Sequence, residues 1–135
     1  MTTKIADLQG MTDAIAAVLK ERGIASNEQF LEAAATPAQR KELAKAAGCE
    51  ARDILELANR ADLARVKGVS GVYSDLLEHA GVDTVPELAQ RRADNLHAKI
   101  VEANAEQGLA KQAPSASQVE SWVAQAKELG RTIKY

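Results

Sequence analysis

The stretch VKGVSGVYSDLLEHAGVDTVPEL, residues 66–88, contains two helical patterns separated by glycine turns. Two of its three glycines recur 58 positions earlier in the chain, where Gly68 corresponds to Gly10 and Gly81 to Gly23. Apolar positions follow the same offset, because Leu77 corresponds to Leu19, Val82 to Ile24 and Leu88 to Phe30. The pattern predicts an internal duplication.

The duplication sets the expected domain organisation. We predict a single domain over residues 1–135, with internal repeats over about 5–62 and 63–129 and a short tail at 131–135. The closing helices of the two repeats align if a seven-residue insertion is allowed around residues 108–117, GLAKQAPSAS. Two copies of about 60 residues favour one globule over an extended array.

Composition favours an all-α fold. The hydrophobic fraction is 46% of 135 residues, but aromatic residues make up only 3% and there are only 3 prolines. The apolar residues are largely Ala, Leu, Ile and Val, a balance that suits closely packed helices better than sheets. A chain of this length buries enough surface to need no disulfide or metal for stability.

Charge and cysteine content restrict the partners and the compartment. The 17 basic and 19 acidic residues give a net charge of -2, so the chain lacks the overall positive field of a nucleic-acid binder. The one cysteine, Cys49, has no internal disulfide partner, and the first residues lack a secretory apolar segment. We expect a cytoplasmic protein with no membrane span.

Capping residues and glycines predict where helices begin and end. Capping-box spacing occurs four times, at Ser26 with Gln29, Thr36 with Gln39, Thr84 with Glu87, and Ser117 with Glu120. Asp94 is the expected cap at the position that matches Thr36, and five glycines are expected helix stops: Gly23, Gly48, Gly81, Gly108 and Gly130. The predicted helices lie near 3–9, 12–22, 27–35, 37–47, 50–66, 71–80, 85–92, 95–107 and 118–129.

Apolar periodicity identifies the expected core. After the second hairpin, the helix is expected to bury Val72, Leu76 and Ala80, while Trp122 and Tyr73 fill the core or a seam between elements. The wider set in or near the core is Leu19, Ile24, Leu31, Leu43, Ile54, Leu57, Leu77, Val82, Leu88, Leu96, Ile100, Val119 and Trp122.

The glycine turns resemble the helix-hairpin-helix motif. The chain from about residue 5 to 129 resembles an uncharacterised bacterial family with two such motifs in one domain. The resemblance is carried by Gly68, Val69, Gly71, Leu77, Gly81 and Val82, and less closely by Gly10, Met11, Leu19, Gly23 and Ile24. It implies two helix-hairpin-helix halves packed with pseudo-twofold symmetry.

In DNA-binding relatives of this motif, the hairpin amides and the start of the second helix hold a backbone phosphate. The resemblance would place that role on four hairpin residues with two flanking cations: Gly68, Val69, Ser70 and Gly71, with Arg65 and Lys67. The first copy, however, has Asp13 at the position of Gly71, where its carboxylate would repel a phosphate. Two cations alone also give weak binding, so we favour a packing role for the hairpins.

Enzymatic chemistry finds little support in the sequence. His79 and His97 are too far apart for a helical metal pair, and Cys49 has no second thiol. The carboxylates at Glu28, Glu32, Asp53, Glu56, Glu102 and Glu106 alternate with basic residues, as solvated helix faces do. We predict no catalytic residue, metal or cofactor. A deep polar pocket holding two or more titratable side chains would favour an enzyme instead.

These observations favour a non-enzymatic binding module, specifically a protein-interaction or adaptor domain. The alternative is weak, sequence-independent DNA or RNA binding through the second hairpin. A third hypothesis, a small apolar ligand held between the halves, requires a cavity that sequence cannot reveal.

Two further features have structural interpretations. Arg91 and Arg92 are expected to stabilise a helix end. The tail at 131–135 is expected either to dock on the domain or to stay free.

Overall fold

In the computed structural model, residues 4, 5, 8, 10–69, 71–129 and 133 are described. Within these residues the protein has eight α-helices and no strand, so the predicted all-α class is confirmed. None of the described helices is both long and apolar enough to cross a bilayer. The helices are α1 (Asp13–Glu21), α2 (Asn27–Ala33), α3 (Pro37–Ala47), α4 (Ala51–Leu63), α5 (Gly71–His79), α6 (Val85–Gln90), α7 (Ala93–Gln107) and α8 (Ala116–Leu129).

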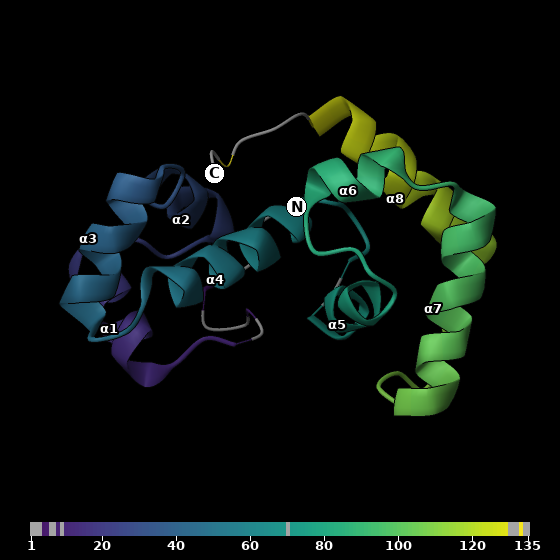
Figure 1. Cartoon of the computed structure of the whole chain (residues 1–135), viewed down its shortest axis with the longest axis horizontal. Helices are drawn as coiled ribbons and strands as arrows, with labels where there is room; N and C mark the ends of the chain where they lie inside the picture. Colours follow the sequence, from purple (N-terminus) through teal and green to yellow (C-terminus); the bar gives the residue numbers. More distant parts are fainter. Residues whose placement is uncertain (1–3, 6–7, 9, 70, 130–132, 134–135) are drawn as a thin grey trace.

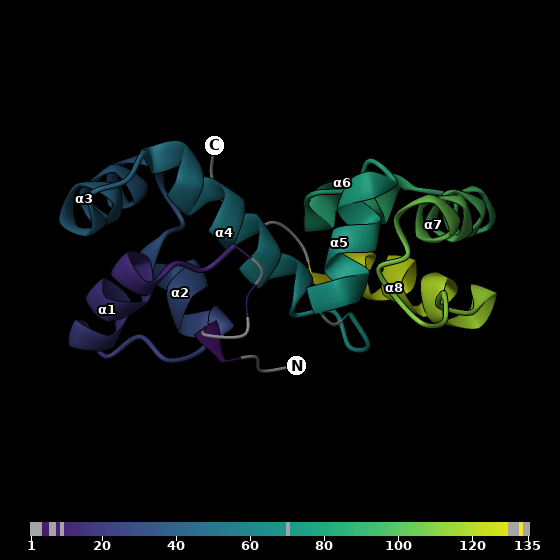
Figure 2. The ribbon, with the colours of Figure 1, turned by 90° about the horizontal axis from the view of Figure 1, so that it is seen from below.

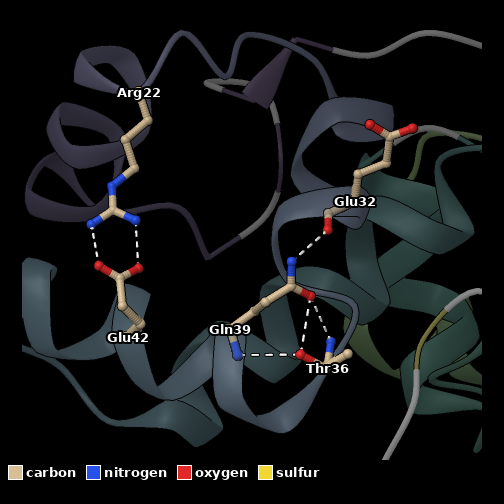
Figure 3. Close-up of polar contacts among 5 residues, drawn as sticks. All are labelled: Arg22, Glu32, Thr36, Gln39 and Glu42. Atoms are coloured by element: carbon tan, nitrogen blue, oxygen red, sulfur yellow. Dashed lines mark hydrogen bonds and ion pairs between the residues drawn. The ribbon is translucent and has the colours of Figure 1, made fainter.

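Local capping chemistry sets most of the helix starts. Figure 3 shows one capping box, in which the Thr36 hydroxyl accepts from the Gln39 amide and the Gln39 side chain accepts from the Thr36 amide. The Gln39 side chain also donates to the Glu32 carbonyl at 3.0 Å, which joins the end of α2 to α3. A second capping box begins α2 at Ser26 and Gln29, and the Thr84 hydroxyl caps α6.

Two predicted helix starts are wrong. The last helix begins at Ala116 and its start is capped by Ser115 with Gln118, not by Ser117 with Glu120. Asp94 is not a cap, because α7 begins one residue before it and its N-cap is Arg92. Most of the helix predicted over 3–9 lies outside the described residues, and Lys4, which is described, forms an isolated β-bridge with Ser26.

Glycine behaves as predicted at the helix ends that are described. Four of the five expected stops have the positive φ of a left-handed cap: Gly23, Gly48, Gly81 and Gly108. Gly130 lies outside the described residues. Arg91, expected to stabilise a helix end, donates to the Ala80 carbonyl at 3.2 Å and so caps α5 rather than its own helix.

The described buried apolar residues form two clusters, one in each half of the chain. The first half, α1 to α4, encloses Phe30, Leu31 and Ile54, whereas the second, α5 to α8, encloses Leu77, Leu88 and Trp122. Figures 1 and 2 show the halves side by side, joined by α4. The last turn of α4 contributes to both clusters, because Ala61 belongs to the first and Leu63 to the second.

The predicted core set is confirmed with one adjustment and one error. All of its members are buried except Ile24, which is partly buried against the first cluster. Val72 was expected to be buried beside Leu76, but it is 38% exposed on α5. The face of α5 that meets α7 and the second cluster contains Leu76 and Leu77, and Val72 falls at its edge.

The helix boundaries follow the offset that relates Gly68 to Gly10. Under this offset both ends of α5 coincide with the ends of α1, and the first residue of α6 coincides with the first residue of α2. The first residue of α8 coincides with that of α4 once the seven-residue insertion is added. Packing is also parallel: α1 contacts α3, and α4 contacts both α2 and α3, while α5 contacts α7, and α8 contacts both α6 and α7.

An ion pair fixes α1 against α3 in the first half. The Arg22 guanidinium donates to both oxygens of Glu42 at 2.5 and 2.6 Å (Figure 3). The hydrogen bond from Arg22 lowers the pKa of the Glu42 carboxyl. Because both side chains are exposed to solvent, this ion pair contributes little to the free energy of unfolding. Its two hydrogen bonds set the orientation of α1 relative to α3.

Candidate binding surfaces

The second hairpin, residues 66–71, is held against α8 by a side chain that sequence reasoning did not single out. The Lys67 amide donates to Gln125 Oε1 at 2.7 Å, and Gln125 Nε2 donates to the Lys67 carbonyl at 3.2 Å. The Val69 amide donates to the Val66 carbonyl at 3.2 Å. Two amides of the predicted phosphate site are therefore engaged within the protein.

Trp122 packs directly under the same hairpin. Gly68 has a φ of +94°, and a Cβ atom built on it would lie 3.0 Å from Trp122 Nε1. Val69 is buried in the second cluster, and Gly71 is the first residue of α5. Ser70 lies outside the described residues. The predicted site residues that are described are thus brought together at one turn, with one face of that turn against α8.

Arg65, one of the two predicted flanking cations, is joined to a buried carboxylate. Its Nη1 donates to Asp62 Oδ1 at 2.8 Å, and the Asp62 side chain is only 2% exposed. Lys67, by contrast, has an exposed side chain. Burial raises the pKa of Asp62 above its ordinary value of 3.8, although the hydrogen bond from Arg65 opposes that shift. The positive charge available to a phosphate is accordingly reduced.

Replacing Asp62 by Asn is expected to change how stability depends on pH. Because the folded state raises the pKa of Asp62, it binds the proton more tightly than the unfolded chain, and ionisation of Asp62 lowers the free energy of unfolding. This loss begins near pH 3.8 and is complete above the raised folded pKa. Urea unfolding between about pH 4 and 7 should show the difference, Asp62→Asn minus wild type, growing with pH. Parallel profiles would contradict the shift.

A cleft of about 600 Å³ lies where the two halves meet. One wall comes from the start of α1, the end of α3 and the exposed side of α4, and the other comes from α5 and Asp83. Its volume is within the range of roughly 300–1,000 Å³ common for ligand pockets. The lining mixes apolar residues with six charged ones, which are Asp53, Glu56 and Arg60 on α4, Asp75 and Glu78 on α5, and Asp83 in the following turn.

Arg60 connects the two walls of this cleft. Its guanidinium donates to Asp75 Oδ1 at 2.6 Å and to Ser74 Oγ at 3.2 Å, and it also pairs with Glu78. The Arg60 side chain is 18% exposed, so these contacts are less screened than those of an open surface pair. Arg60 therefore fastens α4, a helix of the first half, to α5, a helix of the second.

The described lining of the cleft carries an excess of negative charge. Five carboxylates line it and one guanidinium opposes them. Burial raises the pKa of Asp83, and the charges of Glu87, Glu78 and Glu56 raise it further despite Arg60. Burial also raises the pKa of the Cys49 thiol in this lining, with Asp53 and Glu50 adding to the shift. The arrangement suits a cationic group and disfavours an anionic one.

Sequence reasoning missed this cleft because it assigned Asp53 and Glu56 to a solvated helix face. A signal was present: Asp53, Glu56 and Arg60 share one side of α4 at i, i+3 and i+7. Asp75 and Glu78 form a similar pair on α5. Neither pattern, however, predicts that the polar face of α4 packs beside the polar face of α5.

The cleft holds several titratable side chains, and a polar pocket of this kind is typical of enzymes. Among the described residues, however, no three His, Cys, Asp or Glu side chains are grouped closely enough to hold a metal ion. A cleft lies between the halves, as the apolar-ligand hypothesis requires, but its lining combines apolar residues such as Ile15 and Leu57 with six charged side chains.

The eight helices and both surfaces lie within the part of the chain that matches a known domain family. Residues 9–129 match the model of DUF4332, a domain of unknown function, and the chain belongs to that family. No curated protein and no solved structure matches the chain.

Proposed function

We propose that this protein is a non-enzymatic interaction module that accepts a basic segment of a partner protein in the cleft between its halves. The observation that carries this proposal is the excess of carboxylates around Arg60 in a cleft of about 600 Å³. An arginine or lysine side chain of a partner would find acceptors on both walls, at Asp53 and Glu56 and at Asp75 and Glu78.

We further propose that the two halves are helix-hairpin-helix repeats related by a pseudo-twofold axis, and that the hairpins serve packing. Matching hydrogen bonds support the repeat, since the Ile24 amide donates to the Leu19 carbonyl at 2.9 Å and the Val82 amide donates to the Leu77 carbonyl at 2.8 Å. The contacts of Lys67 and Gly68 with α8 support a structural role for the second hairpin.

The chemistry of the cleft also supports binding over catalysis. A cysteine nucleophile is activated by a lowered pKa, whereas the pKa of Cys49 is raised. Asp75 and Glu78 are engaged by Arg60, as in a structural ion pair. With no disulfide to form through Cys49, the cytoplasm remains the compartment in which we expect the module to act.

Fluorescence anisotropy with short labelled peptides tests the binding proposal. A peptide of alternating Arg and Ser should bind at low salt, and an otherwise identical Glu and Ser peptide should not. Asp75→Asn combined with Glu78→Gln should weaken binding about tenfold or more, since each exposed ion pair contributes roughly 0.2–1 kcal/mol and more when water is excluded. Glu102→Gln combined with Glu106→Gln, two exposed residues of α7, is the charge-matched control.

Equal losses in the two double variants would show non-specific attraction to an acidic protein and would reject the cleft. Duplex and single-stranded oligonucleotides in the same titration test the nucleic-acid alternative. Micromolar or tighter binding that is lost with Gly71→Asp would move the function to the second hairpin.

A further inference from the structure

The two walls of the cleft differ in chemistry. The wall formed by the start of α1 and the end of α3, the α1 wall, has small or apolar residues and no charge among its described members, which include Ala14, Ile15, Ala47 and Cys49. The opposite wall, the α5 wall, consists of Asp75, Glu78 and Asp83, all acidic. Figures 1 and 2 show α4 between them, with α1 and α3 on one side and α5 on the other.

In the second half, the chain itself fills the place that corresponds to the α1 wall. Under the offset of the repeat, Tyr73 stands at the position of Ile15, and after the insertion Trp122 stands at that of Leu57. The two rings pack with their centroids 5.5 Å apart. The Tyr73 hydroxyl donates to the Gln112 carbonyl at 3.3 Å, so the loop between α7 and α8 lies against these rings.

That loop shows what kind of segment suits such a place. Ala110 packs against the second cluster, while its neighbours Leu109 and Lys111 are exposed. Asn104 holds the backbone of Ala110, accepting from its amide at 2.9 Å and donating to its carbonyl at 3.1 Å. The loop is therefore a non-helical segment with an inward apolar residue beside an outward cation. In the first half only residues 48–50 separate α3 from α4, and the α1 wall is open to the cleft.

An extended segment matches a cleft that has two unlike walls. Successive side chains of an extended chain point to opposite faces, so every second side chain meets the same wall. A segment in which basic and apolar residues alternate would direct its cations to Asp75 and Glu78. Its apolar side chains would then face Ala14 and Ala47, where they lose contact with water.

We propose that the basic segment bound in the cleft is extended and that Arg or Lys alternates in it with a large apolar residue. The apolar side chain lies on the α1 wall over Ala14, Ala47 and Cys49, and the cation lies on the α5 wall. This inference rests on the proposed function and adds to it the sequence pattern that the cleft selects.

Three labelled peptides of equal length test the pattern by fluorescence anisotropy at one salt concentration. The first alternates Arg and Ser, the second alternates Arg and Leu, and the third has the same Arg and Leu residues in two separate blocks. Burial of Leu on the α1 wall should make the second peptide bind about tenfold or more tightly than the first. The blocked peptide should lose most of that gain, because its Leu side chains would face both walls.

A substitution on the α1 wall locates the apolar contact. Ala14→Glu places a carboxylate at an exposed position of this wall, so it removes apolar surface and adds negative charge. It should abolish the advantage of Leu over Ser without weakening binding of the Arg and Ser peptide. Ala17→Glu is the control, because Ala17 is an exposed residue of α1 outside the described lining. The advantage of Leu should persist in that variant.

The outcomes separate this pattern from the proposed function. Equal affinities of the alternating and blocked Arg and Leu peptides would overturn the pattern, and so would an advantage of Leu that survives Ala14→Glu. Either result would leave a cleft that binds basic segments. If neither alternating peptide bound, or if Asp75→Asn combined with Glu78→Gln left their binding unchanged, the proposed function would fail and the pattern would fail with it.

Discussion

Replacing Gly68 with alanine is expected to lower the free energy of unfolding by about 2–5 kcal/mol. Two costs contribute. A φ of +94° is a conformation that L residues rarely adopt, and strain of this kind costs roughly 1–2 kcal/mol. The added Cβ would also lie 3.0 Å from Trp122 Nε1, so the buried indole must move, which typically costs roughly a further 1–3 kcal/mol.

Gly23→Ala separates these two costs. Gly23 also has a positive φ, +75°, but a Cβ built there meets nothing within 4 Å. Its replacement should therefore cost only about 1–2 kcal/mol of backbone strain. Urea unfolding followed by the fluorescence of Trp122, the one tryptophan of the chain, measures both variants. Equal losses at the two glycines would show that the contact between the hairpin and α8 is loose.

Arg60→Gln is the second change with a large expected effect, and its two readouts have opposite signs. Loss of the guanidinium leaves Asp75 and Glu78 beside Glu56 and Asp83 with no opposing charge in the described lining of the cleft. We expect a loss of about 1–3 kcal/mol in the free energy of unfolding, below the value for a fully buried pair because Asp75 and Glu78 are partly exposed.

The same substitution should raise the affinity of the cleft for the Arg and Ser peptide severalfold, because an internal cation no longer competes for its acceptors. Arg52→Gln, on the same helix, is the control. Arg52 pairs with Glu56 on the open surface, so its loss should change stability by no more than about 0.5 kcal/mol. A fall in peptide affinity with Arg60→Gln would show that Arg60 positions the carboxylates for the peptide and does not compete with it for them.

Helix starts could be predicted where the competing interactions are local. The Ser26 and Thr36 caps involve groups close in sequence, and both are present as expected. The start of α8 was misplaced because Ser115 with Gln118 and Ser117 with Glu120 offer the same spacing, and local chemistry cannot rank them. Asp94 was a good cap by type, but α7 begins earlier, at Ala93, without any side-chain cap.

The candidate sites also differ in how far they could be predicted from local sequence. The hairpin residues Lys67 to Gly71 could be found because they are contiguous and their glycines have a conformational meaning. The partner of that hairpin could not, because Gln125 is distant in sequence and is an ordinary polar residue of a helix. Arg60 was missed for the same reason: its role depends on α5, which approaches α4 only in the folded chain.

The sequence by itself determined the all-α class, the repeated spacing of the helices and most of their caps, since each depends on residue type within one or two helical turns. Only the tertiary structure decided that the apolar residues divide into two clusters, that polar faces of α4 and α5 enclose a negative cleft, and that Ile133 of the tail packs in the first cluster. Amphipathic periodicity states which face of a helix is buried, but the partner of that face is chosen by the packing of the whole chain.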